Sequence, residues 1–189
     1  MSSNYKGESP RFDKLLIFDL DETLIHTYPE QLGRPADIMF ASLHVYRRPY
    51  ARKMLRQLGE YFDMAVWSAG SEDYVEAIVR QVFPAPGKLR FIWGRSRCRM
   101  KWDPETGVGF AVKDLKKVKR LGYPLEKILI IEDTPANVAK NYGNAIYVRQ
   151  YDGSRKDDEM RRLVAYLISI KDVADVRKVD KRGWRNHGH

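Results

Sequence analysis

The sequence of 189 residues lacks the features that mark a secreted or membrane-spanning protein. It contains one cysteine, Cys98, so no disulfide can form within the chain, which favours a reducing compartment. No apolar run approaches the roughly 18 residues that a membrane-spanning helix requires. The N-terminal sequence MSSNYKGESPRF has no apolar core of the kind found in signal peptides. These absences predict a soluble intracellular protein of the cytoplasm or nucleus, with no membrane partner.

Acidic residues are also scarce relative to basic ones. The chain has 25 acidic residues against 34 lysines and arginines, a net charge of +9. The stretch from Arg90 to Lys101 contains five basic residues and no acid. A surplus of positive charge suits acidic partners, either phosphorylated proteins or nucleic acid, although it can serve solubility alone. Hydrophobic residues make up 43% of the chain, enough for a sizeable core in one domain.

Short apolar runs alternate with segments of helical periodicity along most of the chain. The runs LLIF, MAVW, KILII and NAIYV predict strands, and IMFASLHVYRRPY reads as one further strand. Helices are expected at 51–62, 72–83, 113–122, 135–143 and 157–170, with Ser71 as an N-cap. This alternation predicts an α/β fold, a Rossmann-like, doubly wound parallel sheet.

The same pattern suggests where the chain divides. Residues 1–12 are expected to form a flexible arm, 13–170 the folded domain, and 171–189 a basic tail that frays. Within the domain, a small β insert is expected at about 88–112, where three short strand-like segments follow one another. The gaps between the polar motifs are too short for a large cap domain. A monomer is expected.

Polar side chains follow three of the predicted strands. Asp19 and Asp21 end the first, Ser68 ends another, and Glu132 and Asp133 end a third. In parallel sheets, ligands bind beyond the carboxyl ends of the strands, so these groups should meet at one edge. Clustered carboxylates repel one another unless a cation is present, and all-oxygen ligands suit Mg²⁺. One aspartate could then attack phosphorus, a lysine could neutralise charge, and a second aspartate could move protons.

Four segments resemble the motifs of haloacid-dehalogenase (HAD) phosphatases, in the family's order and spacing. DLDETLIHT resembles the first motif, WSAG the second, VKDLKKV the lysine motif and IIEDTP the final acidic motif. The letters ETLIH narrow the resemblance to the FCP/SCP-like branch, which contains the phosphatases of the RNA polymerase II C-terminal domain (CTD). Within it, VWSAG and the C-terminal segment look most like the catalytic domain of the ubiquitin-like-domain-containing CTD phosphatase. The resemblance implies the HAD fold and covers roughly residues 15–167.

The resemblance also implies roles for individual residues. Asp19 would be the nucleophile and a metal ligand, and Asp21 the general acid/base, its backbone carbonyl binding the metal. Thr23 would steady the motif loop, Ser68 would hydrogen-bond the phosphoryl group, and Lys113 would neutralise charge on the nucleophile and the phosphate. Simpler alternatives are that the serine caps a helix and that the lysine is a solvated helix residue.

The acidic motif departs from the family pattern. Asp133 stands where the branch often has Asn as a metal ligand, and Glu132 stands where it usually has Asp, so either acid could contact the metal. The pair could instead cap the following helix. The resemblance places a three-stranded insert beside the site. With Ala69, the arginines Arg95 and Arg97 are expected to bind the substrate, the alternative being a solvated β surface.

The resulting hypothesis is a Mg²⁺-dependent phosphatase that acts on phosphoserine or phosphothreonine in a protein through an aspartyl-phosphate. One alternative is a small-molecule or nucleic-acid-end phosphatase on the same site; the sequence lacks the aromatic-interleaved pattern typical of single-strand binding. Another is a non-catalytic module that binds phosphopeptides.

Overall fold

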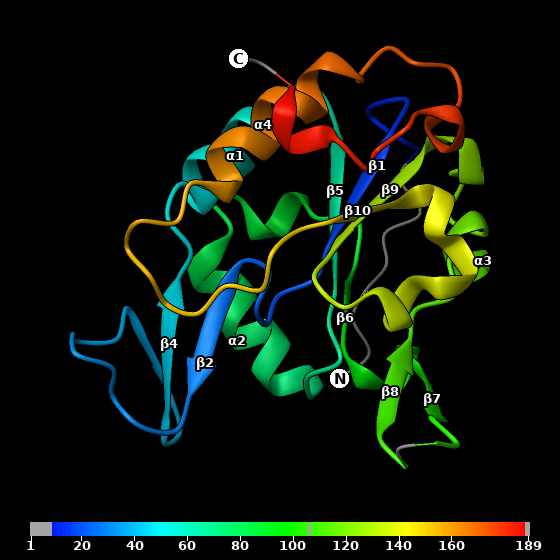
Figure 1. Cartoon of the computed structure of the whole chain (residues 1–189). Helices are drawn as coiled ribbons and strands as arrows, with labels where there is room; N and C mark the ends of the chain where they lie inside the picture. The colour runs from blue at the N-terminus through cyan, green and yellow to red at the C-terminus, as the bar shows by residue number, and fades with distance from the viewer. Residues whose placement is uncertain (1–8, 106, 188–189) are drawn as a thin grey trace.

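A five-stranded parallel sheet forms the centre of the computed structural model, which describes residues 9–105 and 107–187 (Figure 1). The strand order is β10-β9-β1-β5-β6. Leu15 of β1 aligns with Asp63 of β5 on one side and with Ile128 of β9 on the other, so β1 lies between two partners. The strands are β1 (Leu15–Phe18), β5 (Asp63–Trp67), β6 (Ile92–Trp93), β9 (Ile128–Glu132) and β10 (Ala145–Tyr147).

Helices cover both faces of this sheet, which confirms the predicted α/β architecture. Alternate residues of a strand point to opposite faces. Leu16 and Phe18 belong to one core cluster with α1 (Ala51–Leu58), α2 (Glu72–Val82) and α4 (Glu159–Ser169). Leu15 and Ile17 belong to a second cluster with α3 (Lys116–Lys119) and the 3₁₀ segment η4 (Pro135–Asn144). The other 3₁₀ turns are η1 (Pro86–Lys88), η2 (Arg95–Arg97), η3 (Leu125–Lys127), η5 (Val176–Lys178) and η6 (Trp184–Asn186).

An antiparallel sheet follows the first central strand. It contains β2 (Ile25–Tyr28), β3 (Ile38–Phe40) and β4 (Leu43–Arg47), in the order β2-β4-β3. The prediction of a single strand through this region was wrong. Phe40 pairs with Leu43, and Ala41 adopts a left-handed φ of 50°, so the chain reverses within two residues.

The insert at 88–112 differs from the expected three-stranded sheet. Ile92 pairs with Val66, so β6 extends the central sheet instead of joining the insert. Its aromatic residues explain this placement, because the ring of Trp93 lies 4.9 Å from that of Trp67 in the core. Two strands remain, β7 (Arg99–Trp102) and β8 (Gly109–Val112), which form an antiparallel pair.

The observed helices also differ in detail from those predicted from the hydrophobic periodicity. The helix expected at 113–122 is α-helical only over α3, and the helix expected at 135–143 forms the 3₁₀ segment η4. Ser71 precedes α2 without a side-chain capping bond. No helix in the described ranges combines the length and apolar character that crossing a bilayer demands.

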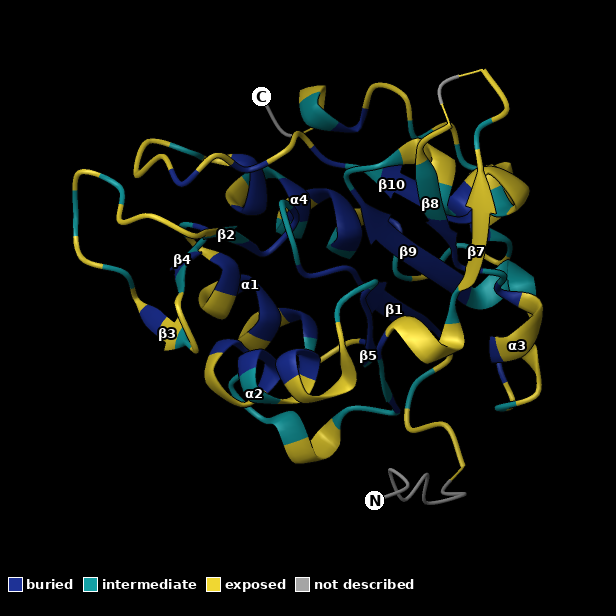
Figure 2. Ribbon diagram, turned by 90° about the horizontal axis from the view of Figure 1, so that it is seen from below, coloured by how far each residue is buried: buried dark blue, intermediate teal, exposed yellow. Residues whose placement is uncertain are grey.

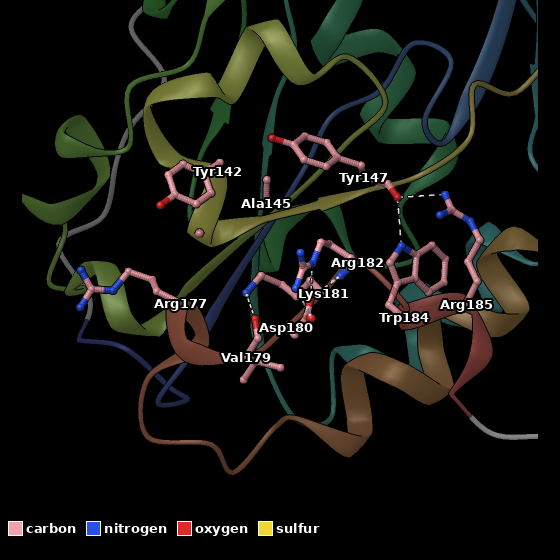
Figure 3. Close-up of a pocket in the computed structure, with 11 residues that line it drawn as sticks. Tyr142, Ala145, Tyr147, Arg177, Val179, Asp180, Lys181, Arg182, Trp184 and Arg185 are labelled. Carbon is pink, nitrogen blue, oxygen red and sulfur yellow. Dashed lines mark hydrogen bonds and ion pairs between the residues drawn. The ribbon is translucent and has the colours of Figure 1, made fainter.

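Residues 171–187 pack against the domain, so the expectation that this segment frays was wrong. Val176 and Trp184 are at most 1% exposed. The Trp184 indole N–H donates to the carbonyl of Tyr147 at 3.0 Å, and Arg185 donates to the same oxygen at 2.9 Å (Figure 3). Residues 188–189 lie outside the described part. The tail thereby covers the β10 edge of the sheet and encloses a pocket of about 490 Å³.

The N-terminal arm is held where the structure describes it. The backbone N–H groups of Arg11 and Phe12 donate to one carboxylate oxygen of Asp63, at 2.8 and 3.0 Å. Residues 1–8 of the predicted flexible arm lie outside the described ranges.

Candidate active site

The first acidic motif begins where β1 ends. The Asp19 N–H donates to Ile131 O of β9 at 3.0 Å, which continues the ladder of the central sheet by one step. This bond fixes the backbone of Asp19 at the carboxyl edge of the sheet, where the residue is only 6% exposed. Amides at positions 23–25 then donate to Leu20 O, forming a tight turn after the motif. The sequence DLDET is therefore held rigidly at the edge where α/β sheets bind their ligands.

A fully buried lysine joins two of the acidic side chains. Lys113 Nζ donates to Asp19 Oδ1 at 2.5 Å and to Glu132 Oε2 at 2.7 Å. Burial opposes the ammonium charge, but the two carboxylates outweigh burial and raise the pKa of Lys113. Burial, together with the charge of Glu132, raises the pKa of Asp19 well above its usual value despite the lysine. Lys113 is therefore a permanent cation beside the candidate nucleophile.

The hydrogen bonds distinguish the two acids of the final motif. Glu132 accepts from Lys113 through one oxygen and from Thr134 N–H and the Asn137 side chain through the other, at 3.3 and 3.2 Å. Glu132 is thus engaged at both oxygens by groups that hold it and the lysine in place. Its pKa is raised by burial.

Asp133 is oriented by neutral donors. Its Oδ1 accepts from the Thr23 hydroxyl at 3.2 Å, and its Oδ2 accepts from Thr134 at 2.9 Å and Gln150 at 3.1 Å. No ion pair to Asp133 is found within the described residues, so its charge is not neutralised by a neighbouring side chain. Thr23 therefore links the first motif to the last, consistent with its expected role in steadying the loop.

The donor set suits a hard divalent cation. Asp19, Glu132 and Asp133 each offer an oxygen, and these atoms lie within 4.8 Å of one another. Carboxylate oxygens, with water and phosphate oxygens, are the ligands that Mg²⁺ takes in proteins. Since Glu132 is already engaged, Asp19 and Asp133 are the acids better placed to hold the ion.

The second aspartate points toward a cluster of hydroxyl groups. Asp21 Oδ1 accepts from Tyr74 at 2.5 Å and from Thr27 at 3.4 Å, and Oδ2 accepts from Ser68 at 3.3 Å. Burial, followed by the charge of Asp21, raises the pKa of Tyr74, which keeps its phenol protonated as a donor. The Ser68 hydroxyl also accepts from Gly70 N–H at 2.9 Å, so the oxygen lies at the mouth of the β5–α2 turn.

The structure brings the side chains of all four sequence motifs to one edge of the sheet. These are Asp19, Asp21, Thr23, Ser68, Lys113, Glu132 and Asp133. Two further predicted residues lie beside them. Ala69 directly follows Ser68, and Arg95 Nε donates to Ala69 O at 2.9 Å. Arg97 does not join them. Its guanidinium lies over the Trp93 ring, 5.4 Å from the centroid.

Sequence reasoning missed four residues that orient this site, namely Thr27, Tyr74, Asn137 and Gln150. Tyr74 lies on the buried face of α2, where helical periodicity indicates only core packing. Asn137 follows the acidic motif closely, and that proximity was the one available signal.

Comparison with known proteins places the chain in a family. The family model described as "NLI interacting factor-like phosphatase" matches residues 14–177. The chain belongs to this family. It is thus a phosphatase, a phosphoric monoester hydrolase, and the FCP/SCP-like resemblance of its motifs is confirmed.

Its similarity to curated members of this family extends over most of the chain. The Xenopus laevis protein named CTD nuclear envelope phosphatase 1 is 25% identical over 189 residues, covering 92% of this chain and 74% of that protein. Human Carboxy-terminal domain RNA polymerase II polypeptide A small phosphatase 1 is 26% identical, with coverages of 88% and 63%. Nuclear envelope morphology protein 1 of Saccharomyces cerevisiae is 26% identical, and the match covers 88% of this chain and 41% of that protein. The narrower resemblance to the ubiquitin-like-domain-containing type stays a prediction.

Solved structures share the fold. Fcp1, described as an essential RNA polymerase II CTD phosphatase, aligns with a TM-score of 0.55 at 15% identity, covering 89% of this chain and 46% of that chain. A haloacid dehalogenase-like hydrolase from Bacteroides fragilis aligns with a TM-score of 0.51 at 16% identity, covering 80% of this chain and 93% of that chain. The HAD fold predicted from the motifs is therefore confirmed.

Proposed function

We propose that this phosphatase hydrolyses phosphoserine or phosphothreonine in a protein segment, with Mg²⁺ as cofactor and an aspartyl-phosphate as intermediate. The observation that carries the proposal is the buried triad of Asp19, Lys113 and Glu132, with Asp133 beside it, at the carboxyl edge of a HAD sheet. This arrangement supports attack by a carboxylate at a place where negative charge is offset.

In the first step, a carboxylate oxygen of Asp19 attacks phosphorus and the bond from phosphorus to the substrate oxygen breaks. The side chain then carries the phosphoryl group as a mixed anhydride. Attack of an anion on an anionic phosphate requires compensating charge, which the ammonium of Lys113 supplies 2.5 Å from the attacking carboxylate. Bound Mg²⁺ would add positive charge at the phosphate oxygens, held by Asp19, Asp133 and the backbone carbonyl of Asp21.

Asp21 moves the protons in both steps. It donates a proton to the departing serine or threonine oxygen, and the carboxylate then accepts a proton from the water that hydrolyses the aspartyl-phosphate. The products are the free hydroxyl and inorganic phosphate, and Asp19 is restored. The hydrogen bonds that Asp21 accepts from Tyr74 and Ser68 support this role, because they hold the Asp21 carboxyl near the expected phosphoryl site.

A protein substrate is supported by the relatives and by the open surroundings of the site. Several relatives are named as CTD nuclear envelope or CTD small phosphatases, and the human relative's name specifies the carboxy-terminal domain of RNA polymerase II. Within the described residues, a three-stranded sheet and a two-stranded hairpin are the accessory sheets, and neither forms a full cap domain. An open site admits an extended polypeptide, whereas a closing lid suits a small metabolite. Arg95 would contact the substrate near Ala69.

The test is hydrolysis of an aryl phosphate and of phosphoserine peptides, with and without Mg²⁺, by the native chain and by Asp19→Asn. We expect turnover that requires both the metal and Asp19, with Arg120→Gln as an exposed control that retains activity. Turnover by Asp19→Asn, or turnover unaffected by a chelator, would contradict the proposal.

The second candidate is a nucleic-acid-end phosphatase on the same site, favoured by the net charge of +9. It predicts that oligonucleotides inhibit peptide hydrolysis with a steep dependence on salt.

A further inference from the structure

Nearly all of the chain's surplus positive charge comes from one stretch of 40 residues. Residues 88–127 contain twelve lysines and arginines and four acids, so they carry a net charge of +8 out of the +9 of the whole chain. The tail is also rich in basic residues, but Arg177 and Arg182 form ion pairs there with Asp175 and Asp180. The surplus is therefore concentrated in one part of the chain.

The fold gathers six of these cations on the exposed side of η2, β7 and α3. This basic surface consists of Arg97, Arg99, Lys101, Lys116, Lys119 and Arg120. Lys117 joins its two parts, because its Nζ donates to Arg97 O at 2.6 Å. Figure 2 shows β7 as exposed along its whole length, with α3 on the same side of the molecule.

The charges of the basic surface are not neutralised by the protein. Within residues 9–105 and 107–187, none of the six cations takes part in an ion pair. Like charges held close together repel one another, and a bound anion removes that cost. The surface therefore suits a partner that carries several negative charges.

Two flat groups lie among these cations. The guanidinium of Arg97 lies over the Trp93 ring, 5.4 Å from its centroid, and that ring is stacked on buried Phe91 at 3.9 Å. Trp102 is 70% exposed. Its ring lies flat against Gly109, since a Cβ added there would meet three ring atoms at 3.0, 3.2 and 3.3 Å. Cations and rings therefore meet at this surface, although the sequence shows no regular alternation of the two.

We propose that the basic surface binds a single strand of nucleic acid through its phosphates and its unpaired bases. A strand offers one negative charge per nucleotide, at regular intervals, to the unpaired cations. Its bases stack on aromatic rings and on guanidinium planes, the groups that Trp102 and Arg97 present. An acidic peptide would satisfy the charge but lacks flat groups for stacking. The strand binds here as a ligand and not as a substrate, so the inference goes beyond the proposed function.

The experiment measures the fluorescence anisotropy of a labelled DNA strand of about 12 nucleotides, a length within the usual range for single-strand sites. Its ends carry no phosphate monoester, so the strand offers the active site nothing to hydrolyse. Six neutralised phosphates correspond to a slope of about −4 in a plot of log affinity against log salt concentration. Between about 50 and about 200 mM salt, the native chain should therefore lose affinity about 300-fold.

Arg99→Gln/Lys116→Gln/Lys119→Gln removes half of the basic surface. Its slope is expected to fall to about −2, so that its affinity falls only about 20-fold over the same range of salt. The three side chains are exposed, so the Tm of this variant should match that of the native chain.

The matched control is Arg52→Gln/Lys53→Gln/Arg56→Gln, which removes three exposed cations from α1. Figure 1 and Figure 2 both show α1 on the other side of the molecule from α3 and β7. The control changes the net charge by the same amount as the basic-surface variant, and it is expected to keep the native slope.

Trp102→Leu distinguishes a nucleic acid from other anionic partners. Loss of base stacking should weaken binding of the strand about ten-fold without a change in slope. Binding to an anionic membrane depends on apolar area and charge, which leucine largely keeps.

No binding of the strand, or equal slopes for the basic-surface variant and the native chain, would overturn the inference. Equal affinity of Trp102→Leu and the native chain would also overturn it. Displacement of the strand by polyglutamate or by phosphatidylserine vesicles at the same concentration of charge would assign the surface to an acidic peptide or a membrane instead.

Discussion

Replacing Lys113 by methionine removes the cation that separates two buried carboxylates. The ammonium makes two ion pairs, at 2.5 and 2.7 Å, and its side chain is 0% exposed. Breaking a buried ion pair by deleting one partner costs about 3–5 kcal/mol, because the other charge is left uncompensated. For a domain of this size, 1 kcal/mol shifts Tm by about 2–4 °C, so we expect Lys113→Met to lower Tm by about 6–20 °C.

The assay is thermal or urea unfolding of Lys113→Met and Lys119→Met. Lys119 lies on the exposed side of α3, so its substitution should change stability by no more than about 0.5 kcal/mol. A double variant separates charge from packing. Lys113→Met/Glu132→Gln also removes one of the two buried carboxylates that would lack a cation. It is expected to be more stable than Lys113→Met alone.

Two results would contradict this expectation for Lys113. One is a Lys113→Met chain as stable as Lys119→Met, which would mean that the buried carboxylates tolerate the loss of the cation. The other is a double variant that is no more stable than Lys113→Met. That result would mean that Lys113→Met loses stability through poorer packing and not through uncompensated charge.

Three further predictions concern residues that hold the site or the tail. Tyr74→Phe should lower kcat about ten-fold with little change in KM, since one hydrogen bond to the Asp21 carboxylate, about 1.5 kcal/mol, is lost; steady-state kinetics with equal kcat would contradict this. Arg48→Met should destabilise the chain by about 3 kcal/mol in urea unfolding, because the buried guanidinium binds Asp157 through two nitrogens at 2.8 and 2.9 Å; an unchanged midpoint would contradict it. Trp184→Ala should cost about 3–5 kcal/mol by the same assay, since the indole is 1% exposed; a loss below about 1 kcal/mol would show that the tail contributes little.

The central strands and the acidic groups of the candidate site could be predicted because the residues that make them are close in sequence. Four consecutive apolar residues end at Asp19, and β9 ends in Glu132, so strand and carboxylate are visible together. Parallel pairing then brings the two strand ends to one edge, which the register of Phe18 with Ile131 confirms.

The rest depended on contacts between distant segments. Ile92 and Trp93 have the composition of any short strand, and only the space beside β5 decides that they extend the central sheet. Trp184 lies among basic residues that indicate a solvated tail, yet its indole finds a buried place beside Tyr166 and an acceptor on β10. Tyr74 reads as a core residue, because its hydroxyl contact with Asp21 joins segments 53 positions apart.

In the proposed mechanism, Asp19 carries the phosphoryl group during turnover. The most direct measurement is acid quench of the Mg²⁺-loaded chain during hydrolysis of a phosphopeptide, followed by digestion and mass spectrometry. We expect a phosphoryl group on the fragment that contains Asp19, sensitive to hydroxylamine and absent from Asp19→Asn. A phosphoryl group on another residue, or turnover by Asp19→Asn at the native rate, would contradict it.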